Sequence, residues 1–107
     1  MSRIPPFNYN RTEGRLTDQD GNRVSFDILD HVELRQSTFP KKIFVLEKIR
    51  FRKSSQKKRK EEIRIGYYII GKKGRMKRRW TWGQFCPFFP PQDLEELTRR
   101  AHEKKII

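Results

Sequence analysis

Residues 41–86, KKIFVLEKIRFRKSSQKKRKEEIRIGYYIIGKKGRMKRRWTWGQFC, decide the fold. Successive side chains of a β-strand point to opposite faces of a sheet, and side chains of this stretch alternate in that way. The alternation occupies three runs, at residues 41–52, 63–70 and 78–86. A charged loop at 53–60 and a glycine-containing turn at 71–75 separate the runs. Short connections of this kind join antiparallel neighbours, so the stretch predicts a three-stranded antiparallel meander.

The two faces of the first run differ in polarity. Ile43, Val45, Ile49 and Phe51 fall on one face, whereas the other begins with Phe44 and Leu46 and becomes basic at Lys48 and Arg50. A helix and a sheet each need an apolar surface to bury against, so a C-terminal helix should cover the apolar face. The residues that we expect beneath it are Ile43, Val45, Ile49, Ile63, Ile65 and Ile69.

A hairpin is expected before the meander. Residues 15–17 and 23–28 alternate, and the Asp20-Gly21 pair between them favours a tight turn, because Gly adopts the positive φ that such a turn requires. The alternation slips at Ile28, which indicates a β-bulge. The sequence therefore adds two strands to the predicted sheet.

The two ends of the chain have different characters. Residues 1–14 contain Pro and Asn without periodicity and predict an irregular arm, with Phe7 and Tyr9 as side chains able to dock on the body. At the other end, Pro91 favours the first turn of a helix, where its missing N–H group has no cost. The apolar stripe of that helix comprises Leu94, Leu97 and Ala101.

Length and composition agree with one small domain. The chain has 107 residues, of which 34% are hydrophobic and 12% are aromatic. This number of hydrophobic residues is sufficient for one hydrophobic core. The aromatic share argues against a disordered basic tail. We therefore expect an α+β fold at residues 15–107: a hairpin, a three-stranded meander and one C-terminal helix packed on one face of the sheet.

Positive charge is concentrated in the middle of the chain. The formal net charge is +13, and residues 41–79 hold seventeen basic side chains against three acidic ones. A localised field of one sign attracts polyanions. We expect this protein to bind nucleic acid without catalysing a reaction, and the composition does not distinguish DNA from RNA.

Basic and aromatic residues adjoin one another at the turn before the last strand. Cations bind phosphates and aromatic rings stack on unpaired bases, so this combination is typical of single-strand binders. We expect a second basic group on the strands, with Arg50 and Arg64 on the same face. The candidate nucleic-acid-binding residues are Arg50, Arg52, Arg64, Lys72, Lys73, Arg75, Lys77, Arg78, Arg79, Trp80 and Trp82.

Three other functions fit parts of the sequence. The apolar segment 85–89 suits an adaptor subunit that docks on a protein of a nucleoprotein complex. A metal-dependent nuclease would use Asp27, Asp30 and Glu33, because carboxylates that converge can hold a divalent cation. The polybasic loop at 53–60 would suit an anionic membrane surface. None of these patterns is specific, and we expect no catalytic residues, metal or cofactor.

The single cysteine and the N-terminus bear on the compartment. Cys86 alone forms neither an internal disulfide nor a Cys-rich zinc site, and its apolar neighbours predict burial. No run of residues is long and apolar enough for a secretion signal or a spanning helix. We therefore expect an intracellular protein that does not insert into membranes.

Overall fold

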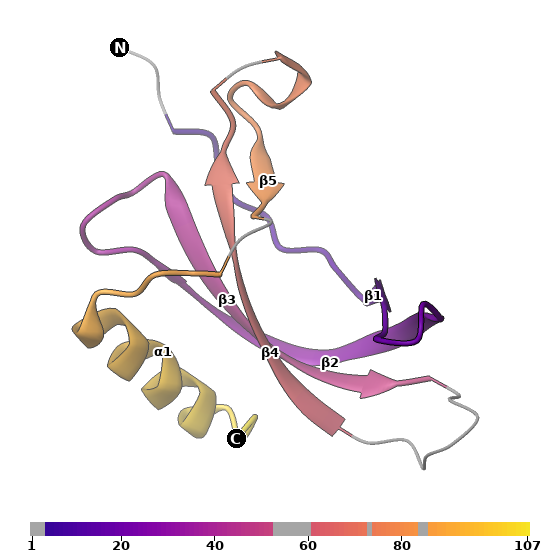
Figure 1. The fold of residues 1–107 in the computed structure, drawn as a ribbon. Coiled ribbons are helices and arrows are strands. Elements are labelled where there is room, and N and C mark those ends of the chain that lie inside the picture. The colour runs from indigo at the N-terminus through magenta and orange to yellow at the C-terminus, as the bar shows by residue number, and fades with distance from the viewer. Residues whose placement is uncertain (1–3, 53–60, 73, 84–85) are drawn as a thin grey trace.

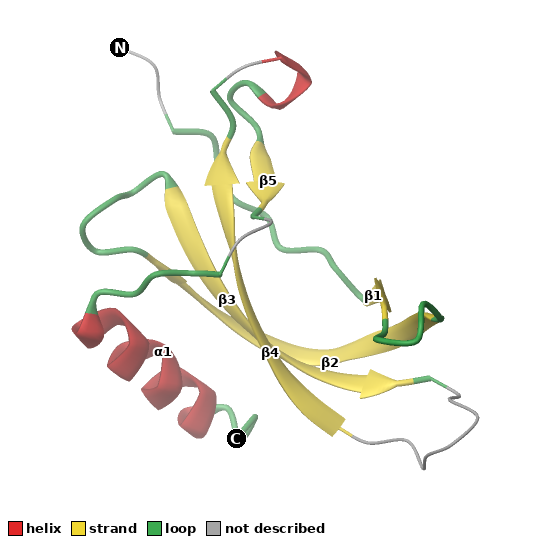
Figure 2. Ribbon diagram, in the orientation of Figure 1, coloured by secondary structure: helices red, strands yellow, loops and turns green. Residues whose placement is uncertain are grey.

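The sheet dominates the structure. A computed structural model describes residues 4–52, 61–72, 74–83 and 86–107, and Figure 1 shows them as a curled sheet with one helix beside it. Figure 2 shows that strand is the main secondary structure. The elements are β1 Glu13–Thr17, β2 Arg23–Arg35, β3 Lys42–Phe51, β4 Glu61–Ile70, the 3-10 turn η1 Gly74–Met76, β5 Trp80–Trp82 and α1 Pro91–Glu103.

All neighbouring strands are antiparallel, in the order β1-β2-β3-β4-β5. The expected hairpin and meander are therefore parts of one five-stranded sheet, which curls into a half-barrel (Figure 1). The α+β class with a C-terminal helix is confirmed. The half-barrel curl was not predicted, because the amount of strand twist is set by packing rather than by alternation.

The helix covers one face of the sheet, which we call the helix face. Leu97 and Ala101 of α1 are completely buried against it. Burial of one leucine of this kind contributes about 1.5–3 kcal/mol. The buried cluster between helix and sheet comprises Val32, Phe44, Leu46, Tyr67, Leu97, Ala101 and Ile106.

The predicted position of the helix was wrong for the residues of β3 and right for those of β4. We expected α1 on Ile43 and Val45, but it lies on the opposite side of β3. The register pairs Leu46 with Ile65, so the isoleucines of β4 share a face with Leu46 rather than with Ile43. Alternation gives the two faces of each strand, but the loop between strands determines which faces coincide.

The start of α1 at Pro91 is confirmed, whereas its expected apolar stripe was partly wrong. Leu94 is 43% exposed, and the neighbouring Asp93 is buried instead. The Asp93 carboxylate accepts a hydrogen bond from the backbone N–H of Ser37 (2.9 Å). This bond fixes the first turn of the helix to the β2–β3 connection. The buried contact that we expected from Leu94 is therefore made by the polar side chain of Asp93.

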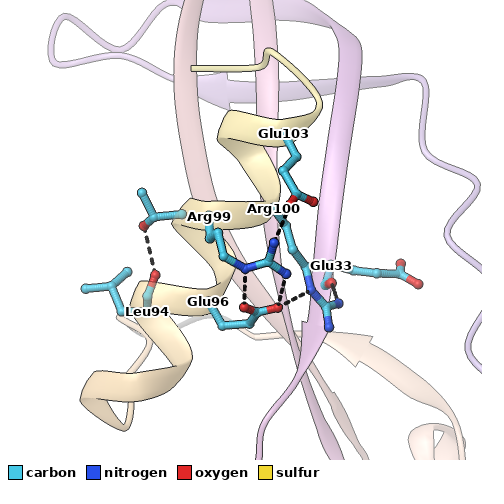
Figure 3. A network of polar contacts seen from close by, with 7 residues as sticks. Glu33, Leu94, Glu96, Arg99, Arg100 and Glu103 are labelled. Atoms are coloured by element: carbon cyan, nitrogen blue, oxygen red, sulfur yellow. Dashed lines mark hydrogen bonds and ion pairs between the residues drawn. The ribbon is translucent and has the colours of Figure 1, made fainter.

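The C-terminal half of α1 lies along β2. Arg100 Nη1 donates to the carbonyl oxygen of Glu33 (2.8 Å), and Lys104 Nζ donates to that of His31 (2.7 Å). Arg100 is held in turn by Glu96, whose carboxylate also binds Arg99 (Figure 3). Long basic side chains therefore join the helix to the strand backbone.

The opposite face of the sheet is the inside of the curl, and we call it the arm face. Residues 4–12 run across it, as the trace beside β5 in Figure 1 shows. The ring of Phe7 lies 5.0 Å from that of Tyr68, and Tyr9 stacks on His31. The prediction that Phe7 and Tyr9 dock on the body is confirmed, and the arm takes the role that we had given to the helix.

The strand boundaries differ most from the predicted ones in β2 and β5. The bulge is confirmed as a register shift between Ile28 and Asp30, but β2 continues beyond it to Arg35. The last strand was predicted at 78–86; β5 comprises Trp80–Trp82, and residues 84 and 85 of the predicted range lie outside the described residues. Arg78 has a φ of 63°, a left-handed backbone conformation that a strand does not contain. No helix in the described part of the chain is long and apolar enough to cross a membrane.

Candidate nucleic-acid interface

The connection between β4 and β5 forms a compact basic turn. The backbone N–H of Gly71 donates to Arg79 O (3.1 Å), and that of Arg78 donates to Gly71 O (3.0 Å). Gly74 has a φ of 64°, which suits a residue without a Cβ. These bonds close the turn, so its side chains project from a defined backbone. We use the name basic turn for Lys72, Arg75, Lys77, Arg78 and Arg79.

All five side chains of the basic turn are exposed. None of them takes part in a hydrogen bond, an ion pair or a ring contact with the residues that the structure describes. Lys73, the sixth predicted cation of this segment, lies outside the described residues. Five cations on one turn, with no acidic partner in the described part of the chain, leave a local positive field that can receive an anion.

The predicted cations at the end of β3 have acidic partners. Arg50 binds Glu61 (2.8 Å), and Arg52 binds both Glu13 and Asp27 (2.6 Å each). Two carboxylates accepting from one guanidinium raise the pKa of Arg52 above its ordinary value. This group lies at the opposite end of β4 from the basic turn (Figure 1), so the structure does not combine the two into one patch. Lys53 and the lysine-rich loop lie outside the described residues.

Arg64 does not share a face with Arg50, contrary to the prediction. The register pairs Arg50 with Glu61 and Glu47 with Arg64, which places the two arginines on opposite faces of the sheet. The Arg64 guanidinium lies 5.2 Å from the ring centre of Phe26 and 4.6 Å from that of Trp82. Burial, followed by the nearby charge of Arg11, lowers the pKa of Arg64. Arg64 is thus part of the arm face rather than of an outer surface.

The two predicted stacking residues, Trp80 and Trp82, are half-buried on the arm face. Trp80 Nε1 donates to Pro5 O (2.9 Å), and the Phe7 ring meets its indole edge-on at 5.4 Å. The ring of Trp82 lies against the guanidinium groups of Arg11 and Arg64, each 4.6 Å from its centre. Side chains of the arm and sheet occupy the indole faces, so a base can stack on them only when the arm moves.

A polar row on the arm face was not predicted from the sequence. His31 of β2, Glu47 of β3 and Arg64 of β4 are successive cross-strand partners. Glu47 is completely buried and accepts a hydrogen bond from the hydroxyl of Tyr9. Burial and this bond raise the pKa of Tyr9, so its hydroxyl remains a donor. The available signal was Glu47 itself, a carboxylate on a strand face that is otherwise apolar.

The three acidic residues of the predicted nuclease site have separate partners. Asp27 binds Arg52, Asp30 binds Lys104 Nζ (2.8 Å), and Glu33 lies 3.7 Å from His31 Nε2. The hydrogen bond from Lys104 lowers the pKa of Asp30. Within the described ranges, no group of three or more His, Cys, Asp or Glu side chains is arranged to hold a metal ion.

The segment before α1 was expected to bury Cys86, and this prediction was wrong. Cys86 is exposed, whereas the nearby Phe89 stacks on Phe44 with ring centres 3.9 Å apart. Phe89, rather than Cys86, packs against the buried cluster of the helix face. Phe88 points outward and is 84% exposed.

Comparison with known proteins gives no guide to function. The chain matches no protein-family model, no curated protein and no solved structure. Any assignment therefore depends on the geometry and charge described above.

Proposed function

We propose that this protein binds nucleic acid without catalysing a reaction, through contacts between the basic turn and phosphates. One observation carries the proposal: five exposed cations project from one turn and have no acidic partner among the described residues. Other basic groups, such as Arg50 and Arg52, are neutralised by carboxylates. An unneutralised cluster supplies the electrostatic part of nucleic-acid affinity.

The same proposal includes an intracellular location, where nucleic acid is the abundant polyanion. Trp80 and Trp82 follow the basic turn directly in the sequence, so a strand held there would lie close to both indoles. Stacking on them requires movement of the arm, because Phe7 and Arg11 contact the two rings. Phosphate contacts are therefore the first interaction, and base contacts are secondary.

The test is a salt titration with single-stranded DNA, duplex DNA, RNA and heparin, followed by Trp fluorescence and anisotropy. Each phosphate contact contributes about 0.7–0.9 to the slope of log affinity against log salt. The variant R75A/K77A should therefore lower the slope by about 1–2 and weaken binding of every nucleic acid. The matched control R15A/R23A removes two exposed cations from the β1–β2 hairpin and should leave the slope unchanged. Equal effects of the two variants would contradict the proposal.

A second candidate function is that of an adaptor in a nucleoprotein complex, with the segment 86–89 as its protein contact. The exposed ring of Phe88 favours it, since an 84% exposed aromatic side chain has little packing role in the free chain. The variant F88S should keep the stability and nucleic-acid affinity of the wild type. It should lose any concentration-dependent association seen by sedimentation velocity, and unchanged association would exclude Phe88 as the contact.

A further inference from the structure

The polar row on the arm face has unused hydrogen-bonding capacity. Glu47 is 0% exposed, yet its Oε1 atom has no hydrogen-bond partner. Its cross-strand partner Arg64 likewise has an unpartnered Nη1 atom. Buried polar atoms are nearly always hydrogen-bonded, because burial without a partner costs free energy. Two orphaned atoms on neighbouring residues of one face indicate a place for a ligand.

Tyr9 partly occupies this place. Its ring stacks on His31 with centres 3.7 Å apart and planes inclined by only 17°. Its hydroxyl donates to Glu47 Oε2, which leaves Oε1 unsatisfied. A flat ring on an aromatic neighbour, with a donor directed at a carboxylate, is also the way in which proteins hold an unpaired nucleobase.

We propose that the arm face binds one unpaired guanine in the position that Tyr9 occupies. Guanine carries two adjacent N–H donors on its Watson–Crick edge, one on the ring and one on the amino group. These two donors match the two oxygen atoms of Glu47, whereas Tyr9 supplies only one. The ring would stack on His31, and the unpartnered Nη1 of Arg64 is available for an acceptor of the nucleotide.

The path of the arm shows how a strand can reach the site. Pro5 lies at Trp80, next to the basic turn, and Tyr9 lies at His31. A strand with phosphates on the basic turn can follow the same path after displacing residues 4–9. This route rests on the proposed function, whereas the guanine site itself also admits a free guanine nucleotide.

The experiment compares oligonucleotides that contain one guanine, inosine or adenine in an otherwise identical pyrimidine sequence. Inosine lacks the amino group and therefore loses one donor to Glu47. A hydrogen bond to a charged group is worth about a tenfold change in affinity or more, so the guanine oligonucleotide should bind about tenfold more tightly than the other two. This comparison needs no variant and is independent of any folding defect.

Two variants identify the residues responsible. E47Q should reduce the preference for guanine to about twofold or less, because its amide has a donor in place of one acceptor. Y9F retains the ring but loses the bond to Glu47, so the arm competes less well and guanine should bind about fivefold more tightly. The control variant Y67F removes a tyrosine hydroxyl from the opposite face of the sheet. It should change neither the preference for guanine nor the affinity for guanine.

The outcomes separate this inference from the proposed function. Equal affinity for guanine, inosine and adenine oligonucleotides would overturn the guanine site and leave phosphate binding by the basic turn intact. Guanosine monophosphate, titrated into Y9F, gives the second comparison. If it binds Y9F but not Y9F/E47Q while no oligonucleotide binds, the guanine site is supported and the proposed function is overturned. If neither ligand binds, both are overturned.

Discussion

Glu47 of β3 and Arg64 of β4 are direct cross-strand partners, and they place two opposite charges on neighbouring strands beneath the N-terminal arm. The pair contains the only completely buried carboxylate among the described residues. Arg64 in turn lies between the rings of Phe26 and Trp82, so one cation links β2, β4 and β5. The polar row is therefore in contact with aromatic rings of β2 and β5 as well as with the arm.

Substitution of Arg64 should destabilise the protein. R64M leaves the Glu47 carboxylate buried without its cross-strand cation, so the free energy of unfolding should fall by about 2–3 kcal/mol, somewhat less than for a completely buried pair. The control R50M breaks an exposed ion pair with Glu61 and should cost less than about 1 kcal/mol. Urea denaturation measures both, and equal losses would show that Arg64 has no special role.

Gly66 should not tolerate a side chain. A Cβ atom at this position would overlap the indole of Trp82. G66A should therefore displace the indole, lower the free energy of unfolding by about 1–3 kcal/mol and shift the Trp emission. In a double-mutant cycle with W82L, which makes room, G66A should cost clearly less. An unchanged cost in the W82L background would mean that the contact with Trp82 is not the cause.

The end of α1 offers a stabilising substitution. Lys105 has a φ of 60°, and the N–H of Ile106 donates to Ala101 O (2.9 Å), an arrangement in which Gly is usual. K105G should raise the free energy of unfolding by about 0.5–1 kcal/mol, because it removes the cost of a left-handed backbone. Lys104 has a right-handed conformation with a φ of −81°, so K104G should instead destabilise. Thermal denaturation distinguishes the two.

Acid should weaken the helix through Glu96. Hydrogen bonds from Arg99 and Arg100 lower the pKa of Glu96 from 4.5 to about 2. A carboxyl group whose pKa is lower in the folded state stabilises the fold above its unfolded pKa, and that contribution disappears as the pH falls from 4.5 towards 2. The melting temperature of E96Q should therefore depend less on pH in this window than that of the wild type. If the melting temperatures of E96Q and the wild type changed with pH in parallel, Glu96 would not be the group responsible.

The strands and the helix could be predicted because their signals are local. Alternation identified β3 and β4, and the proline at residue 91 gave the start of α1. The face covered by the helix could not be predicted, since β3 is apolar on both sides and the register depends on a loop. The exposed basic turn was predictable from charge alone, and its residues are placed as a group.

The polar row could not be predicted, because it forms only when three strands align. Glu47 is an isolated acid in an apolar run, and Tyr9 is 38 residues away in the sequence. Likewise, nothing local indicates that Arg52 binds Asp27 whereas the Arg79 side chain has no partner among the described residues. Which cations are neutralised is decided by the register, so the sequence overestimates the size of the basic surface.

The bonds from Arg100 and Lys104 to β2 have a consequence for self-association. β1 pairs only with Arg23–Asp27, so the rest of β2 has a lateral edge without a neighbouring strand in the described chain. Such an edge is a template for pairing with the same strand of another molecule. The two cationic side chains hold the carbonyl groups of Glu33 and His31, and loss of α1 would release them. We therefore expect a variant without α1 to aggregate more readily than the wild type.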